Sequence, residues 1–219
     1  MDEETLKAIA GQLRQPNGEH GKQVAEKMNE GNLQMNLNTI EALNLTAGDN
    51  VLEIGMGNGF FVKDILRVAD NIKYTGCDFS SLMVDEAQNL NKGFVESEQA
   101  KFMVASAEKL PFGDETFDKV FSINTIYFWN DPRLVLAEIS RVLKPTGQIT
   151  ISIRPKIVME QYPFTKYGFT MLSKDDLVNL LTVNNFTITD TVEKEEPPQE
   201  INGEKLMMEM LVVSAEKIF

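Results

Sequence analysis

One short stretch, residues 51–61, constrains the fold more than any other part of the chain; its sequence is VLEIGMGNGFF. The apolar residues 51–54 predict a buried strand, and apolar positions resume after glycines at Gly55, Gly57 and Gly59. Because glycine lacks Cβ, it adopts positive φ angles and lets a ligand approach the bare backbone. Free N–H groups at the start of the next helix would face that ligand. The stretch therefore predicts a strand, a tight turn and a helix that together hold a ligand, although a purely structural turn stays open.

The glycine spacing narrows the choice of ligand. A dinucleotide-binding turn follows the pattern Gly-x-Gly-x-x-Gly and needs its third glycine at position 60, where this chain has Phe60. Residues 51–61 contain no Lys or Arg, and the carboxylate of Glu53 would repel an approaching pyrophosphate. A cationic or zwitterionic nucleoside fits this turn better.

These residues resemble motif I of the class I S-adenosylmethionine-dependent methyltransferases. In that family a Glu/Asp-x-Gly-x-Gly-x-Gly turn holds the amino-acid end of the cofactor. The resemblance implies that Glu53, Gly55, Gly57 and Gly59 bind S-adenosylmethionine.

A second acidic position follows the next predicted strand, residues 73–77, which ends at Asp78. A carboxylate there can accept hydrogen bonds from both ribose hydroxyls of an adenosine. The alternative is that Asp78 caps the helix that starts near Ser80. Asp78 resembles the ribose-binding carboxylate of the family, and the resemblance places Phe79 near the adenine.

Residues 105–118, ASAEKLPFGDETFD, carry a further resemblance. They are similar to the Gly-Asp-Ala-Glu-x-Leu-Pro-Phe segment of the subgroup that includes the ubiquinone and menaquinone biosynthesis methyltransferases. The resemblance implies that Ala107 and the residue before it contact the adenine, with Glu108 beside them. Here Ser106 replaces the usual aspartate, so the contact loses charge assistance and we expect weaker cofactor binding.

The fourth predicted strand, residues 119–123, is followed by residues that we expect on the acceptor side of the site. Ligands of open α/β sheets bind beyond the carboxyl ends of strands, so Asn124 should lie beside the sulfur end of the cofactor. Tyr127 and Trp129 are candidate walls of a substrate pocket, or they pack the strand end. For a hydroxyl or amine acceptor, His20 and Tyr127 are the weak candidates for taking a proton, and a structural role for His20 stays open.

Charge and cysteine content argue against several classes of partner. Asp plus Glu is 33 against 21 for Lys plus Arg, a net charge of -12, which disfavours nucleic acid and anionic membranes. Cys77 is the single cysteine and no Cys/His cluster exists, so we expect no metal site and a reducing compartment. The acidic start, residues 1–4, does not resemble a secretory signal, and no apolar run could span a bilayer. We therefore expect a cytoplasmic protein with a small-molecule acceptor. The sequence does not indicate its oligomeric state.

Helix and strand patterns alternate after residue 47 and predict an α/β fold. We expect a Rossmann-like three-layer sandwich with a seven-stranded, mostly parallel sheet and N-terminal helices. Residues 186–192 and 206–215 should form an antiparallel C-terminal edge hairpin, joined by a polar loop at residues 193–200.

The predicted domains are an N-terminal helical cap, residues 1–47, and one compact S-adenosylmethionine-binding methyltransferase domain, residues 48–219. The cap helices either fold over cofactor and substrate or only cover the sheet. Residues 154–172 are rich in aromatic side chains and are a candidate lid.

The predicted function is methyl transfer from S-adenosylmethionine to a small molecule. Such a displacement depends mainly on alignment, so the lack of an evident base is no objection. A non-catalytic module that binds S-adenosylmethionine or S-adenosylhomocysteine is the alternative, and an NAD-dependent oxidoreductase is a third, less favoured one.

Overall fold

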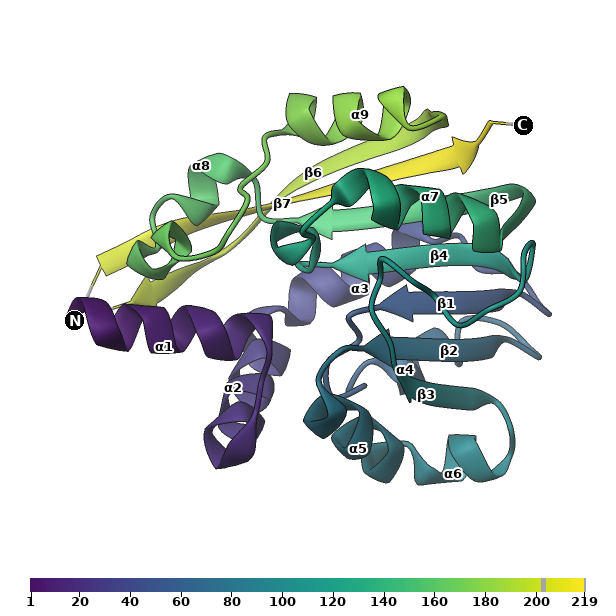
Figure 1. Cartoon of the computed structure of the whole chain (residues 1–219), viewed down its shortest axis with the longest axis horizontal. Coiled ribbons are helices and arrows are strands. Elements are labelled where there is room, and N and C mark those ends of the chain that lie inside the picture. The colour runs from purple at the N-terminus through teal and green to yellow at the C-terminus, as the bar shows by residue number, and fades with distance from the viewer. Residues whose placement is uncertain (202–203, 219) are drawn as a thin grey trace.

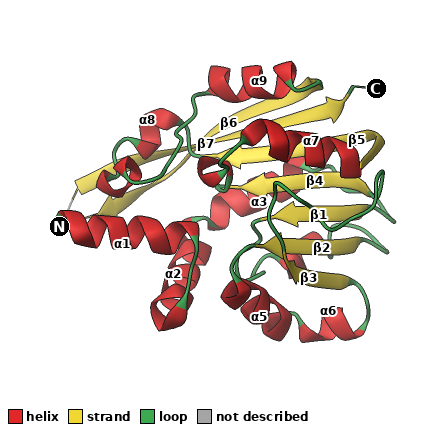
Figure 2. Cartoon of the chain, in the orientation of Figure 1, coloured by secondary structure: helices red, strands yellow, loops and turns green. Residues whose placement is uncertain are grey.

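A computed structural model describes residues 1–201 and 204–218. Within these residues seven strands form one sheet in the order β3-β2-β1-β4-β5-β7-β6 (Figures 1 and 2). Neighbours among the first five strands are parallel, whereas β7 is antiparallel to both β5 and β6. The strands are β1 (Asn50–Ile54), β2 (Lys73–Asp78), β3 (Ala100–Val104), β4 (Phe117–Ile123), β5 (Leu143–Ile153), β6 (Phe186–Ile201) and β7 (Glu204–Lys217). The prediction of a mostly parallel sheet with an antiparallel C-terminal hairpin is confirmed.

Helices cover both faces of the sheet. Because side chains alternate along a strand, Leu52 and Val120 pack into one apolar cluster and their neighbours Val51 and Phe121 into another. The first cluster includes α7 (Pro132–Val142) and α9 (Lys174–Val183); the second includes α3 (Leu33–Ala42), α4 (Val62–Ile65) and α5 (Ser81–Leu90). The three-layer sandwich is thus as predicted.

Several helix ends are encoded by local sequence. Asp131 accepts hydrogen bonds from the backbone N–H groups of Arg133 and Leu134, and Pro132 occupies the first turn of α7, where no N–H is needed. Ser173 and Asp176 form a reciprocal capping box at the start of α9. These short-range signals fix where the covering helices begin.

The remaining helical elements lie at the edges of the sandwich. They are α1 (Glu3–Arg14), α2 (Gly18–Gly31), α6 (Lys92–Glu96), the 3-10 helix η1 (Ile126–Phe128), α8 (Lys156–Met159) and the 3-10 helix η2 (Pro163–Lys166). In Figure 1, α1 and α2 lie on the side to which the arrowheads of β1, β2 and β4 point. The N-terminal helices therefore face the carboxyl ends of the central strands. Among the helices of the described residues, none is both long and apolar enough to cross a membrane.

The predicted polar loop at residues 193–200 is wrong, because β6 continues through it to Ile201. Glu193 to Glu196 pair with Leu211 to Met208 of β7, and a register shift between Glu196 and Gln199 accommodates the two prolines. Prolines are tolerated because β6 is an edge strand. Glu196 is buried beside Arg154, with which it forms an ion pair. Arg154 lies 42 residues before Glu196, so the sequence does not reveal this ion pair. The ion pair makes the charged stretch compatible with a strand.

Candidate cofactor and acceptor site

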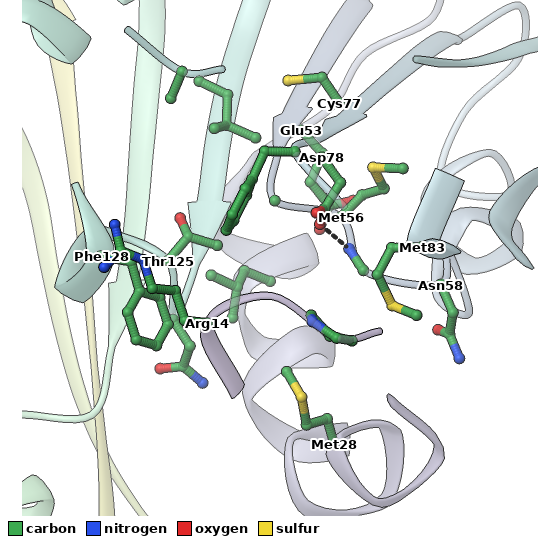
Figure 3. Close-up of a pocket in the computed structure, with 18 of the residues that line it drawn as sticks. Arg14, Met28, Glu53, Met56, Asn58, Cys77, Asp78, Met83, Thr125 and Phe128 are labelled. Carbon is green, nitrogen blue, oxygen red and sulfur yellow. Dashed lines mark hydrogen bonds between the residues drawn. The ribbon is translucent and has the colours of Figure 1, made fainter. Parts of the chain in front are cut away.

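A cavity of about 290 Å³ lies at the carboxyl ends of the central strands (Figure 3). Its walls come from the loop after β1, the ends of β2, β3 and β4, and helices α1 to α3. Ten of the predicted site residues line it: Glu53, Gly55, Gly57, Asp78, Phe79, Ser106, Ala107, Glu108, Asn124 and Trp129. The strand ends and the N-terminal helices therefore border one cavity.

The three glycines of the turn have positive φ angles but different surroundings. A Cβ on Gly55 (φ 76°) would come within 2.2 Å of the Thr125 side chain. A Cβ on Gly59 (φ 67°) would come within 3.0 Å of Ala87 on α5, and Gly59 does not line the cavity. Gly57 (φ 57°) lines the cavity, and a Cβ there would meet no atom within 4 Å. Gly55 and Gly59 thus allow close packing, while Gly57 leaves backbone open to a ligand.

Glu53 is a buried carboxylate next to this turn, with 7% of its surface exposed. Its Oε2 accepts a hydrogen bond of 2.5 Å from the hydroxyl of Tyr74. Burial raises the pKa of Glu53 to about 7, the nearby charge of Asp78 adds to the rise, and the Tyr74 hydrogen bond opposes it. A perturbed carboxyl in a cavity is a common property of functional sites.

Asp78 fixes the turn from the end of β2. Its Oδ2 accepts from the N–H of Gly57 at 3.1 Å and its Oδ1 from the N–H of Ser80 at 2.9 Å. Burial raises the pKa of Asp78, and these backbone hydrogen bonds oppose the rise. The N-cap of α5 is Ser80, whose side chain accepts from Met83, so the alternative role of Asp78 as the cap is wrong.

The predicted adenine side is more open. Phe79 is 41% exposed and forms part of the cavity rim. Ser106 is exposed, and its Oγ accepts from the N–H of Glu108 at 3.3 Å. The serine hydroxyl is therefore positioned by the loop that carries Ala107.

Asn124 connects the end of β4 to the N-terminal helices and has a left-handed conformation with φ 55°. Its Nδ2 donates to Asn32 Oδ1 at 3.3 Å, and its Oδ1 accepts from Tyr127 at 3.0 Å. The Tyr127 hydroxyl also accepts the backbone N–H of Arg154 at 2.6 Å. Burial raises the pKa of Tyr127 above its ordinary value.

Besides Gly59, two predicted residues do not reach the cavity. Tyr127 lies behind its wall, 3% exposed, because its hydroxyl bonds to Asn124 and to the Arg154 backbone. His20 is exposed on α2 and does not line the cavity. The aromatic segment at residues 154–172 contributes no lining residue either; instead η2 contacts α1 and α8 contacts β7.

Sequence reasoning missed the polar residues that the N-terminal helices supply. Arg14 of α1, Asn29 of α2, Asn32 between α2 and α3, and Asn36 of α3 line the cavity. Asn36 is only 9% exposed, and its Nδ2 donates to the backbone oxygen of Asn32 at 2.9 Å. The amphipathic pattern of residues 1–47 indicates which apolar residues pack inward, but it does not reveal which polar ones border a ligand.

The sheet order and the position of the cavity together define the class of protein. The cavity lies beyond the ends of the parallel strands, next to a backbone-lined turn after β1 and a carboxylate at the end of β2. This arrangement is typical of nucleoside binding by Rossmann-like folds. A family model described as methyltransferase domain matches residues 52–151. The chain belongs to the class I S-adenosylmethionine-dependent methyltransferases, as the sequence motifs predicted.

Similar proteins agree with this family. An uncharacterized methyltransferase of Bacillus subtilis, YdaC, is 31% identical over 125 residues, which is 57% of this chain and 67% of that protein. The ubiquinone/menaquinone biosynthesis C-methyltransferase UbiE of Desulfotalea psychrophila is 34% identical over 128 residues, covering 56% of this chain and 50% of that protein. Across the first four relatives, the chain spans 41% to 67% of their own length.

Solved structures share the fold. A methyltransferase from Haloferax volcanii, in complex with the Trm112 methyltransferase activator, superposes with a TM-score of 0.77 at 18% identity. The match covers 89% of this chain and 93% of that one. The similarity thus extends over most of the chain and is not confined to the central sheet.

Proposed function

We propose that this protein transfers a methyl group from S-adenosylmethionine to a small-molecule acceptor. The observation that carries the proposal is the open backbone at Gly57, flanked by the buried carboxylates of Glu53 and Asp78. A bare turn between two carboxylates suits a cationic nucleoside and repels a pyrophosphate. Relatives described as O-methyltransferases and as a C-methyltransferase support the reaction class.

The residues present fit this cofactor. Asp78 would accept hydrogen bonds from the ribose hydroxyls, and Glu53 would attract the ammonium group of the amino-acid end. Phe79, Ser106, Ala107 and Glu108 would border the adenine. When bound, S-adenosylmethionine supplies a methyl carbon made electrophilic by a positively charged sulfur.

We propose that residues 1–47 act as the cap of a domain formed by residues 48–219. Leu13, Arg14 and Met28 of the cap line the same cavity as the strand ends, and Figure 3 shows Arg14 and Met28 at its border. A closed cap excludes water and holds the acceptor in line with the methyl group, and such alignment supplies much of the rate enhancement. A cytoplasmic location stays a prediction from the sequence.

Calorimetric titration with S-adenosylmethionine, S-adenosylhomocysteine and NAD tests the cofactor. We expect binding of the first two and none of NAD; the reverse result would refute the proposal. A screen for transfer of labelled methyl groups to a metabolite library then separates an enzyme from a non-catalytic binding module, because only the enzyme modifies a compound. The D78N variant, run through the same screen, controls for transfer by contaminating proteins.

A further inference from the structure

The charges that line the cavity are unevenly distributed. Its carboxylates lie on the sheet side: Glu53 is in β1, Asp78 ends β2 and Glu108 is in the loop after β3. Among the described residues that line the cavity, Arg14 is the only Lys or Arg. Figure 3 shows Arg14 and Phe128 together on one side of the cavity, well apart from Asn58 on the other side. The cavity therefore has an anionic strand side and a cationic end next to Phe128.

Arg14 is held at this end but not neutralised. It is the last residue of α1, and its Nη2 donates to Asn130 Oδ1 at 3.1 Å, in the loop after β4. The arginine ion pairs within the described residues involve Arg133, Arg141 and Arg154, and none involves Arg14. A guanidinium has five N–H donors, so one bond to Asn130 leaves most of them for a ligand.

The amide of Asn32 supplies a second donor. Its Oδ1 accepts from Asn124 Nδ2 and from Arg154 Nη2, each at 3.3 Å. Only the oxygen of an amide can accept two hydrogen bonds, so the NH₂ group points the other way. Within the described residues this NH₂ has no hydrogen-bond partner, and Asn32 lines the cavity. Cap residues thus offer donors where the strand side offers acceptors.

Among the described residues that line the cavity, those at the cap end cannot take a proton from an acceptor. The described lining residues include no His, Lys or Tyr, and the three carboxylates are on the strand side. The remaining ionisable side chain, Cys77, is a buried thiol whose pKa burial raises to about 12. A neutral alcohol or a protonated amine would have no base to activate it, whereas an acceptor that is already ionised needs none.

We propose that the methyl acceptor carries an oxyanion at neutral pH, a carboxylate or an acidic phenol or enol, and that Arg14 and the Asn32 amide bind it. This inference rests on the proposed function. The acceptor oxygen uses a lone pair to form the new C–O bond while the methyl–sulfur bond breaks and its electron pair stays on sulfur. The negative charge of the acceptor and the positive charge of the sulfonium disappear together, so no proton has to leave.

Matched pairs of acidic and neutral compounds test the class of acceptor. The protein is first saturated with S-adenosylhomocysteine and then titrated with aromatic acids and their amides, beginning with benzoate and benzamide, and with acidic phenols and their methyl ethers. Trp129, the only tryptophan and a cavity residue, reports binding by fluorescence. We expect at least one acid to bind about tenfold more tightly than its neutral partner, as a charge-assisted hydrogen bond would provide. If no acid is preferred, the proposal is overturned.

Substitution of Arg14 assigns the preference to this side chain. R14Q should remove the tenfold preference and leave the neutral compound unchanged, while R14K should retain part of it. R67Q is the matched control, because Arg67 is exposed and lies outside the cavity. Equal loss in R14Q and R67Q, or an unchanged preference in R14Q, would contradict the role of Arg14.

The cofactor is itself a carboxylate, and a separate titration distinguishes it from the acceptor. R14Q should bind S-adenosylmethionine as tightly as the unmodified protein does. If R14Q loses affinity for S-adenosylmethionine but not for 5′-methylthioadenosine, which lacks the amino acid, Arg14 binds the cofactor and the inference fails. If the unmodified protein binds neither S-adenosylmethionine nor S-adenosylhomocysteine, the proposed function itself fails.

Discussion

The hydroxyl of Tyr74 donates a 2.5 Å hydrogen bond to Glu53 Oε2, and both side chains are buried under the glycine turn. Burial disfavours the charged form of the carboxyl and raises its pKa to about 7, with Asp78 adding to the effect. The charge of the carboxyl beside the glycine turn therefore changes near neutral pH. Two predictions follow from this change, one for cofactor affinity and one for stability.

Cofactor affinity should increase as pH rises from 6 to 8, with a midpoint near the Glu53 pKa of about 7, because only the ionised carboxylate attracts a cation. Calorimetry with S-adenosylmethionine across this range measures the effect. In Y74F the midpoint should move to higher pH, since the hydrogen bond that lowers the Glu53 pKa is lost. E53Q is the control: its affinity should be low and lack this transition. An affinity that stays constant from pH 6 to 8 in the unmodified protein would contradict the prediction.

E53Q should be more stable than the unmodified protein at pH 8. The Glu53 pKa is about 7 in the folded protein against an ordinary 4.5, so the folded state holds its proton longer and stability falls as pH rises between these values. The full difference amounts to roughly 3 kcal/mol above pH 7 and becomes small near pH 5. Urea unfolding of both proteins at pH 5.5 and 8 checks this. A gain that is equal at both pH values would show that the carboxyl does not titrate as described.

Much of the strand side of the cavity could be predicted because its signals are short-range. The turn needs glycine where φ is positive or packing is close, so Gly55 can be recognised in the sequence. Asp78 can be recognised because it ends the second predicted strand, and it accepts a hydrogen bond from the turn at Gly57. The alternation of apolar runs likewise indicates the order of helices and strands.

The side of the cavity that the N-terminal helices form could not be predicted in the same way, since its residues meet only in three dimensions. Arg14 reaches Asn130 across 116 positions of sequence, and Arg154 reaches Asn32 across 122. Glu196 looks like part of a solvated loop until its partner Arg154 is known. Tyr127 is an aromatic residue of the kind that often lines a pocket. Its hydroxyl instead hydrogen-bonds to the Arg154 backbone inside the core.

Alanine at Gly55 and at Gly57 should have opposite main effects. G55A should destabilise the protein by roughly 2 to 4 kcal/mol, because a positive φ is unfavourable for alanine and the new Cβ would overlap Thr125. G57A should cost only about 1 to 2 kcal/mol, for its φ alone, but it should abolish most cofactor binding because it adds a Cβ in open space at a residue that lines the cavity. Urea unfolding and titration with S-adenosylhomocysteine separate the two effects. Similar stability losses in both variants would contradict the packing seen around Thr125.

Asp78 should be needed for binding of any compound with a ribose. The two carboxylate oxygens of Asp78 already accept hydrogen bonds from the N–H groups of Gly57 and Ser80. The amide of D78N has only one acceptor oxygen. We expect affinity for S-adenosylhomocysteine to fall roughly 10- to 100-fold, the loss expected for a charge-assisted hydrogen bond. D70N, at an exposed aspartate outside the cavity, should bind like the unmodified protein. Equal affinity of D78N and D70N would exclude the ribose contact.

The ion pair between Arg154 and Glu196 should matter most when only one partner is removed. Both side chains are buried, and Glu196 Oε1 has no hydrogen-bond partner among the described residues. R154M would leave a buried carboxylate without its cation and should destabilise the protein by roughly 3 to 5 kcal/mol, whereas the R154M/E196M double variant should recover most of that loss. Urea unfolding of the three proteins measures this. Arg154 Nη2 also donates to the backbone oxygen of Gly31 at 3.0 Å. Both variants lose this contact with the N-terminal helices, so both should bind S-adenosylhomocysteine less tightly. A double variant as unstable as R154M would show that the cap contact, and not the unpaired charge, dominates.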